Sequence, residues 1–250
     1  MSAYTRIMLK LSGEALNHSA SLRSASGSGQ APEEHTVLSN EALHRIAGEI
    51  MAVAKIPVQI AVTIGGGNIW RYRDMKDAAI ERTVSDAMGM LATIMNAVAL
   101  QAALEAMGGV SRVCSAIDVP QLAEPYLRRR AIRHLEKGRI VICAGGTGHP
   151  YFTTDSAAAL RAIELGCEVI LKATNVDGVY DQDPRKVKDA KRYEEVTLQE
   201  AIEKNLNIMD QAALSLCREQ KLPIVVFNFG EQGNLLKVAK GEKVGTKVSP

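Results

Sequence analysis

The chain of 250 residues has little excess charge and few cysteines. Lys and Arg number 30 and Asp and Glu number 28, which leaves a formal net charge of +2. The molecule as a whole therefore offers no general attraction to nucleic acid or to an anionic membrane, and any charge-driven binding must be local. The cysteines form no CxxC pair and lie in apolar or helical surroundings at Cys114, Cys143, Cys167 and Cys217. We expect each to be a buried, reduced thiol.

The sequence also lacks clear targeting and membrane signals. The opening stretch, MSAYTRIMLKLSGEAL, has no uninterrupted apolar region and no small-residue cleavage site, and it is typical of a strand. The most apolar segment, 87 to 109, is interrupted by Asn96, Gln101 and Glu105, so it falls short of the roughly 18 apolar residues of a membrane span. We expect a cytoplasmic protein with no membrane partner. A helix that is apolar nearly all round must be covered, either by the core of its own chain or by another subunit.

Two familiar phosphate-binding motifs are absent, because no GxxxxGK[ST] occurs and no GxGxxG follows a strand. What is present is an alternation of strand and helix patterns. Short apolar runs typical of strands buried on both faces occur at 6–11, 58–64, 111–117, 139–144, 168–174 and 223–229. Helical patterns occur at 39–55, with Ser39 or Asn40 as N-cap, and at 78–107, 121–137, 154–166 and 209–220. The alternation predicts one α/β domain over residues 1–250, with a mainly parallel sheet between helices. The Ser- and Gly-rich segment 18–35 is predicted to be a mobile surface loop.

Three of the predicted strands run into glycine-rich turns. These are LKLSGEA after the first, TIGGGNIWR after the second and CAGGTGHPYFTTD after the strand at 139–144. Parallel strands end at a common edge, so the three turns are expected to lie together. Backbone N–H groups in such turns, together with the positive ends of the helices that follow, favour phosphate. The pattern therefore indicates a site for several phosphate groups.

A few charged side chains lie beside these turns. Lys10 precedes Ser12 and Gly13 and offers a compact cation to a transferring phosphoryl group, the alternative being a surface lysine at a strand end. Arg71 offers a planar fork to phosphate, although the sequence RYRDMKD could also place it on a solvated face. Asp155 either belongs to the site or simply favours the dipole of its helix. The basic stretch 128–139 is interrupted by apolar residues at helical spacing, which favours a solvated helix face over a nucleic-acid partner.

Six ordered blocks of the sequence cover nearly the whole chain except 17–38, namely LKLSGEAL, IGGGNIWR, DAMGMLATIMNAVALQAALE, AGGTGHPYFTTDSAAALRAIELG, LKATNVDGVYDQDP and MDQAALSLCREQKLPIVVFN. Together these blocks resemble the bacterial uridylate kinases of the amino acid kinase superfamily. The resemblance implies an open αβα sandwich and transfer of the ATP γ-phosphoryl group to UMP, giving UDP, in pyrimidine nucleotide biosynthesis. It also implies Mg²⁺ carried with ATP, a homohexamer and an allosteric enzyme.

The resemblance carries residue roles over by position. The residues implied in catalysis are Lys10, Arg71, Asp155 and Asp210. Those implied in ATP binding are Lys10, Leu11, Ser12, Gly13, Gly67, Arg71, Thr174, Tyr180 and Asp183. Those implied in UMP binding are Gly66, Asp86, Thr147, Gly148, His149, Pro150, Tyr151, Phe152, Thr153 and Thr154. No residue is implied as a metal ligand. Asp86 would hold the UMP ribose, and the glycine-rich turn that leads into TTD would wrap the nucleotide.

The chemistry of the reaction agrees with a site that has no obvious general base. The second pKa of a phosphate monoester is near 6, so the nucleophilic oxygen of UMP is already ionised at neutral pH. Catalysis would rest on in-line positioning and on neutralising the repulsion between two anionic nucleotides. Lys10, Arg71, Mg²⁺ and backbone amides would do this, and His149 would either contact substrate or bond within its own turn.

The sequence departs from the family pattern at two positions in this region. His149 stands where the family usually has Asn, and Tyr72 replaces a glycine that commonly follows the arginine. Two other classes of function stay open. A sister kinase acting on a carboxylate or carbamate is disfavoured by Asp86 and TGHPYFTTD. A nucleotide-binding regulatory or storage protein without turnover is disfavoured by the joint presence of Lys10, Arg71 and Asp155.

Overall fold

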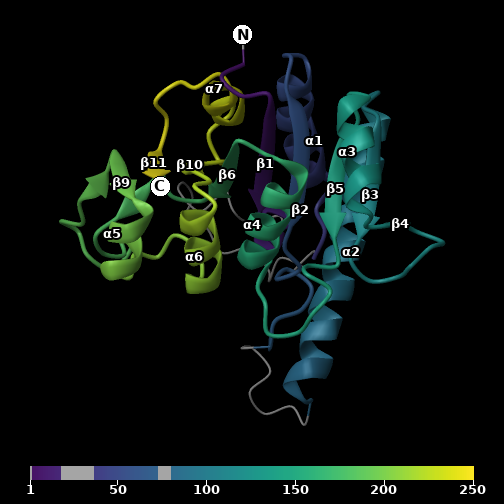
Figure 1. Ribbon diagram of the computed structural model, residues 1–250, viewed down its shortest axis with the longest axis horizontal. Helices are drawn as coiled ribbons and strands as arrows, with labels where there is room; N and C mark the ends of the chain where they lie inside the picture. Colours follow the sequence, from purple (N-terminus) through teal and green to yellow (C-terminus); the bar gives the residue numbers. More distant parts are fainter. Residues whose placement is uncertain (1, 18–36, 73–79) are drawn as a thin grey trace, which may run out of the picture.

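The protein is described by a computed structural model that covers residues 2–17, 37–72 and 80–250. The segment 18–35, predicted to be a surface loop, lies outside the described residues. Figure 1 shows a central sheet that crosses the view from β9 at one end to β4 at the other, with helices on both faces. The predicted αβα sandwich with a mainly parallel sheet is confirmed.

The main sheet has nine strands in the order β4-β3-β5-β2-β1-β6-β10-β11-β9. The bounds are β1 Arg6–Leu11, β2 Gln59–Ile64, β3 Ser111–Ser115, β4 Glu124–Pro125, β5 Ile140–Ala144, β6 Val169–Thr174, β9 Glu195–Thr197, β10 Ile224–Asn228 and β11 Thr246–Ser249. Neighbouring strands are parallel, except that β10 and β11 are antiparallel. A small second sheet pairs β7, Val179–Tyr180, with β8, Arg192–Tyr193. All six strands predicted from the apolar runs are present.

The strands are apolar on both faces because helices cover both. In β1, Ile7 and Leu9 face one core and Met8 faces the other, as the two-residue repeat of a strand requires. The first core also contains residues of α1 Asn40–Ala54, α2 Arg82–Ala106 and α7 Asn234–Ala239. The second contains residues of α3 Arg128–Glu136, α4 Thr154–Leu165, α5 Leu198–Glu203 and α6 Gln211–Glu219.

The predicted helices are confirmed with one correction. Ser39 is the N-cap of α1, and its side chain accepts a hydrogen bond from the N–H of Ala42. The helix predicted over 121–137 begins only at Arg128. Glu124 and Pro125 form the short strand β4 beside β3, because a residue that precedes proline is held in extended conformation. Of the helix predicted over 78–107, residues 78 and 79 lie outside the described residues.

The long helix α2 is covered on one side only. Ile94, Ala97 and Leu100 are buried, whereas Leu91 and Met95 are 49% and 54% exposed. In Figure 1 this helix extends beyond the edge of the sheet. Among the described residues, α2 is the one helix whose length and apolar composition would allow it to cross a membrane. Core helices of soluble proteins often have the same length and composition. Of the two alternatives for covering this helix, the core of its own chain therefore accounts for one side only.

The four cysteines are buried and free. Burial raises the pKa of Cys114, Cys167 and Cys217 to about 12 and raises that of Cys143 as well. These thiols are therefore protonated and unreactive at neutral pH, as predicted for structural cysteines.

Candidate functional site

Two adjoining cavities lie at the carboxyl edge of the central strands. The first, of about 530 Å³, is lined by η1 (Gly13–Leu16), by the turns after β2 and β5, and by the start of α2. The second, of about 510 Å³, is lined by 172–185 and by 205–208. Lys10, Ser12 and Glu14 line both cavities. A ligand group bound at Lys10 can therefore be reached from both cavities.

Lys10 belongs to a buried charge cluster at this junction. The parallel register of β1 and β6 places Lys10 directly beside Lys172. Asp155, in the first turn of α4, bridges them, with its carboxylate oxygens 2.6 Å from Lys10 Nζ and 2.8 Å from Lys172 Nζ. Lys172 also donates to the carbonyl of Ile208. Because Lys10 is only 8% exposed, the alternative of a surface lysine is wrong.

The electrostatics of the cluster are those of two cations sharing one anion. Burial raises the pKa of Asp155, but Lys10 and Lys172 outweigh burial and hold that pKa below its ordinary value. Burial lowers the pKa of Lys172, and Asp155 opposes this effect. Asp155 therefore holds the two lysine side chains together at the junction, and Asp210 also acts to raise the pKa of Lys172.

Asp210 lies at the edge of the first cavity and ties two helices together. Its carboxylate caps α6 by accepting from the N–H of Ala213 at 2.9 Å. It also accepts hydrogen bonds from the hydroxyls of Ser156, at 2.9 Å, and Thr153. Thr153 is in turn the N-cap of α4. Asp210 therefore positions the helix that carries Asp155.

The glycine turns are required by close packing as well as by conformation. A Cβ atom on Gly13 would lie 2.4 Å from Asn68 Oδ1, and one on Gly66 would lie 2.8 Å from the carbonyl oxygen of Gly89 in α2. Gly145 and Gly148 have φ angles of 73° and 82°, a region that side chains disfavour. These positions bring the backbone of three separate segments to one edge.

Arg71 lines the first cavity. Its Nε donates to the carbonyl oxygen of Gly67 at 2.5 Å, and its guanidinium is paired with Glu14. Arg71, Gly67 and Ser12 therefore line the same cavity.

Asp86 lies in the wall of the first cavity, near the start of α2. The guanidinium Nε of Arg82 is 2.9 Å from each of its carboxylate oxygens. The backbone N–H of Tyr151, a residue with a φ angle of 70°, donates to Asp86 Oδ2 at 2.8 Å. The carboxylate is therefore held from two directions.

The loop after β5 contributes to the first cavity unevenly. Five of its predicted residues line the cavity, namely Thr147, His149, Phe152, Thr153 and Thr154. Gly148, Pro150 and Tyr151 belong to the same loop but are not among the lining residues. The backbone N–H of His149 donates to Thr147 Oγ1 at 3.2 Å, so a main-chain group of His149 helps to close the turn, and His149 also lines the cavity.

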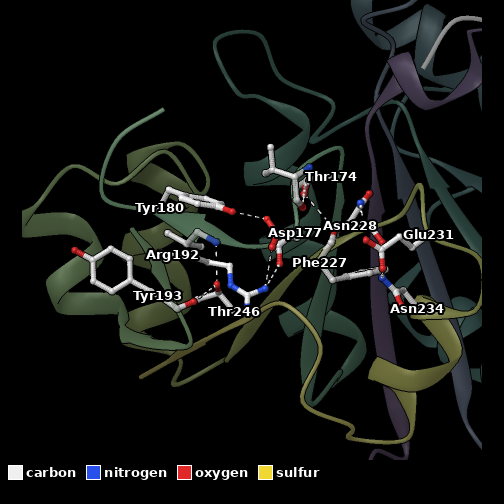
Figure 2. Close-up of polar contacts among 12 residues, drawn as sticks. Thr174, Asp177, Tyr180, Arg192, Tyr193, Phe227, Asn228, Glu231, Asn234 and Thr246 are labelled. Carbon is white, nitrogen blue, oxygen red and sulfur yellow. Dashed lines mark hydrogen bonds and ion pairs between the residues drawn. The ribbon is translucent and has the colours of Figure 1, made fainter. Parts of the chain in front are cut away.

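The second cavity contains the predicted residues Thr174, Tyr180 and Asp183. Figure 2 shows the Tyr180 hydroxyl directed at Asp177, with a distance of 2.7 Å, and Arg192 on the other side of the same carboxylate. The hydroxyl of Thr174 donates to the carbonyl oxygen of Phe227, or to that of Val176. Leu11, which was also predicted to bind ATP, is completely buried and lines neither cavity.

Sequence reasoning missed Lys172 and Arg82. Lys172 had a usable signal, because it interrupts the apolar run EVILKAT as Lys10 interrupts RIMLKL. Arg82 had none, since an arginine at a helix start is typical of a solvated surface. Its role became visible only from its contacts.

The described part of the chain holds no group of three or more His, Cys, Asp or Glu side chains that could ligate a metal ion. Mg²⁺ commonly binds through substrate phosphates and one or two carboxylates, with water completing its shell. The residues present therefore fit a metal delivered with a nucleotide better than a dedicated protein cage.

Comparison with known proteins identifies the class of protein that this fold and site define. The model of the amino acid kinase family matches residues 5–228, and the chain belongs to that family.

Particular relatives narrow the comparison. The chain is 51% identical to the uridylate kinase of Cereibacter sphaeroides, over 98% of this chain and 94% of that protein. It is similar to the crystal structure of UMP kinase from Bacillus anthracis, with a TM-score of 0.89, 38% identity and coverage of 98% and 96%. The UMP kinase structure from Ureaplasma parvum gives a TM-score of 0.87 at 35% identity, with coverage of 98% and 99%.

Proposed function

We propose that this protein is a UMP kinase, which transfers the γ-phosphoryl group of ATP to UMP and releases ADP and UDP. The observation that carries the proposal is the buried Lys10 at the junction of two nucleotide-sized cavities. The 51% identity to a uridylate kinase over nearly the whole chain supports the choice of acceptor. The activity would reside in one catalytic domain that spans residues 1–250.

The acceptor UMP occupies the first cavity in this proposal, and ATP occupies the second. The ATP nucleoside lies against Thr174, Tyr180 and Asp183, and the triphosphate leads towards Lys10 and Ser12, which line both cavities, and towards Gly13 in the first. The UMP ribose meets Asp86, and its base lies within the loop 147–154. The transferring group is then in line between the two nucleotides.

Charge neutralisation does most of the catalytic work. Lys10 offers its ammonium to the transferring group, and Arg71 exchanges its pairing with Glu14 for phosphate oxygens. Asp155 holds Lys10 in place and offsets its repulsion with Lys172. No general base is needed because the attacking oxygen of UMP is already ionised at neutral pH.

Magnesium enters the proposal as a partner of ATP. When bound, Mg²⁺ would neutralise charge on the β- and γ-phosphates. Asp155 and Asp210 are two of the carboxylates that line the first cavity, and both are already engaged with lysines, hydroxyls or a backbone amide. These two side chains would therefore offer the ion outer contacts at most, and phosphate and water would supply the rest.

The proposal also includes a homohexamer with allosteric control, located in the cytoplasm. Support for assembly comes from α2, whose exposed face carries Val84, Leu91 and Met95 at 51%, 49% and 54% exposure. Apolar residues in such a row favour burial against another subunit. Mass measurement in solution at micromolar concentration tests the assembly, and a monomer would overturn it.

The first test of function is ADP release with single acceptors. ATP and Mg²⁺ are supplied with UMP, CMP, dCMP, acetylglutamate, aspartate or carbamate in separate reactions. Turnover with UMP alone is the expected result. Turnover with a carboxylate or carbamate instead would favour a sister kinase, and turnover with none would favour a nucleotide-binding protein without activity.

A further inference from the structure

The contacts of Arg82 go beyond those of an ordinary surface arginine. It begins α2 and lies one turn before Asp86. Its Nε is equidistant from the two carboxylate oxygens, at 2.9 Å from each. The side chain of Asp86 is 17% exposed and that of Arg82 is 42% exposed, so the arginine covers the carboxylate from the solvent side.

Two aromatic rings hold the guanidinium in place. The carbon Cζ of Arg82 lies 4.7 Å from the ring centroid of Tyr72 and 5.7 Å from that of Tyr151. Tyr72 belongs to the segment after β2 and Tyr151 to the loop after β5. Arg82 thus ties together three segments of the acceptor wall. A planar cation suits stacking, and a lysine ammonium would lose the geometry of the fork.

The same carboxylate is also fixed by the backbone. The N–H of Tyr151 donates to Asp86 Oδ2 at 2.8 Å. A carboxylate has about four lone-pair sites, of which Arg82 and Tyr151 occupy up to three. Since Asp86 lines the first cavity, the remaining acceptor capacity is available to a hydroxyl of the ligand.

We propose that Arg82 is a positioning residue that orients the Asp86 carboxylate towards a ribose hydroxyl of the acceptor nucleotide, with Tyr72 as its stacking platform. The proposal rests on the function proposed above. It assigns the discrimination between ribose and deoxyribose at that site to Asp86 as held by Arg82. An exposed ion pair one helical turn apart contributes little to stability by itself. The contribution of Arg82 is therefore expected in acceptor binding and selectivity.

The test compares Arg82→Gln with Arg133→Gln. Arg133 is a matched control, because it also pairs within its own helix, with Glu136 at 3.2 Å, but it lies on α3 outside both cavities. Acceptor binding is measured without ATP by the fluorescence of Trp70. This is the single tryptophan of the chain, and it lines the first cavity with its Nε1 2.9 Å from Ser85 Oγ. UMP, 2′-deoxy-UMP and 3′-deoxy-UMP are the probes.

We expect Arg82→Gln to weaken UMP binding about tenfold while leaving the KM for ATP unchanged. The wild type is expected to bind at least one of the two deoxynucleotides more weakly than UMP. In Arg82→Gln, the ratio of the dissociation constant for that deoxynucleotide to the one for UMP should fall towards one. Merely structural damage would weaken all three probes equally, and so would contradict the positioning role. Arg133→Gln should match the wild type in every measurement.

Variants of Tyr72 keep the proposal testable if Arg82→Gln fails to fold. Tyr72→Phe retains the ring and should bind UMP as the wild type does, whereas Tyr72→Ala should weaken it about threefold. Equal binding by these two variants would overturn the platform role. Failure of the wild type itself to bind UMP would overturn the proposed function. Normal wild-type binding with no effect at Arg82 would overturn only this inference.

Discussion

The two cavities are nearly equal in volume, at about 530 and 510 Å³, but they are built differently. The first collects side chains and turns from segments far apart in the sequence, from Lys10 to Asp210. The second is formed largely by one continuous stretch, 172–185, together with 205–208. The first therefore depends on correct packing of the whole sheet edge, and the second depends more on local hydrogen bonds.

The two cavities also differ in how their polar groups are held. In the first, Asp86, Asp155 and Asp210 are each fixed by partners from another segment. In the second, Tyr180 is bonded to Asp177, three residues away, and Thr174 bonds either within its own turn or to the carbonyl oxygen of Phe227 in β10. Substitutions in the first cavity should thus affect more than one element of the fold, and the following predictions test this difference.

The largest effect is expected at the buried charge cluster around Lys10. Asp155→Asn leaves Lys10 and Lys172 side by side without their shared anion. Loss of one partner from a buried ion pair costs about 3–5 kcal/mol, and urea unfolding at pH 7 measures it. Glu136→Gln, in an exposed pair of α3, is the control and should cost under about 1 kcal/mol.

The stability difference should also depend on pH. Lys10 and Lys172 hold the pKa of Asp155 below its ordinary value despite burial, so its stabilisation is complete above about pH 4, the ordinary value of a free Asp. It is lost as pH falls through the lowered pKa. The wild type and Asp155→Asn should therefore converge as the pH falls well below about 4. A difference that stayed constant into this range would show that the carboxylate charge is not the cause.

Removing the ammonium group of Lys10 should lower the rate of the reaction. Lys10→Ala is expected to lower kcat by at least about a hundredfold, because a preorganised charge contact with the transition state is typically worth that much. Steady-state ADP release at saturating UMP and ATP measures it. Lys204→Ala, which removes an exposed lysine paired with Glu200, should leave kcat unchanged. An unaltered kcat in Lys10→Ala would contradict the catalytic role.

A selective effect on the first cavity is expected from Asp86→Ala. Loss of the carboxylate should raise the KM for UMP about tenfold or more, since a charged hydrogen-bond acceptor to the ligand is removed. The KM for ATP should stay within about twofold, because Asp86 lines only the first cavity. Equal increases in both Michaelis constants would contradict the assignment of this cavity to UMP.

The smallest effect is expected in the second cavity. Tyr180→Phe removes the hydrogen bond to Asp177 and keeps the ring, so the KM for ATP should rise only about twofold to fivefold. The KM for UMP should not change. A selective increase in the UMP value would mean that the two cavities have been assigned in the wrong order.

The strands and the glycine turns were predictable from sequence because both depend on local chemistry. The apolar runs of β1, β2, β3, β5, β6 and β10 can be read directly, since strands buried on both faces need such residues. The short strands β7, β8, β9 and β11 carry too few residues to give a pattern. The premature start of the helix predicted at 121–137 shows that apolar spacing alone is outweighed by Pro125.

The charge cluster could be predicted only in part. Lys10 and Asp155 were found from motifs, but the pairing with Lys172 depends on β1 and β6 being neighbours in register. These two strands are more than 150 residues apart in the sequence, and no local pattern in a single sequence predicts that they pair. The platform of Tyr72 and Tyr151 around Arg82 is likewise a product of three converging segments.

By itself, the sequence determined the fold class, the order of the main elements, the family resemblance and the residue types available for phosphate binding. These follow from hydrophobic periodicity, turn chemistry and motif spacing, which act over a few residues. The tertiary structure alone decided which charges meet, how Asp86 is oriented and which side of α2 stays exposed. These properties depend on contacts between segments that are far apart in the sequence, and local sequence patterns do not predict such contacts.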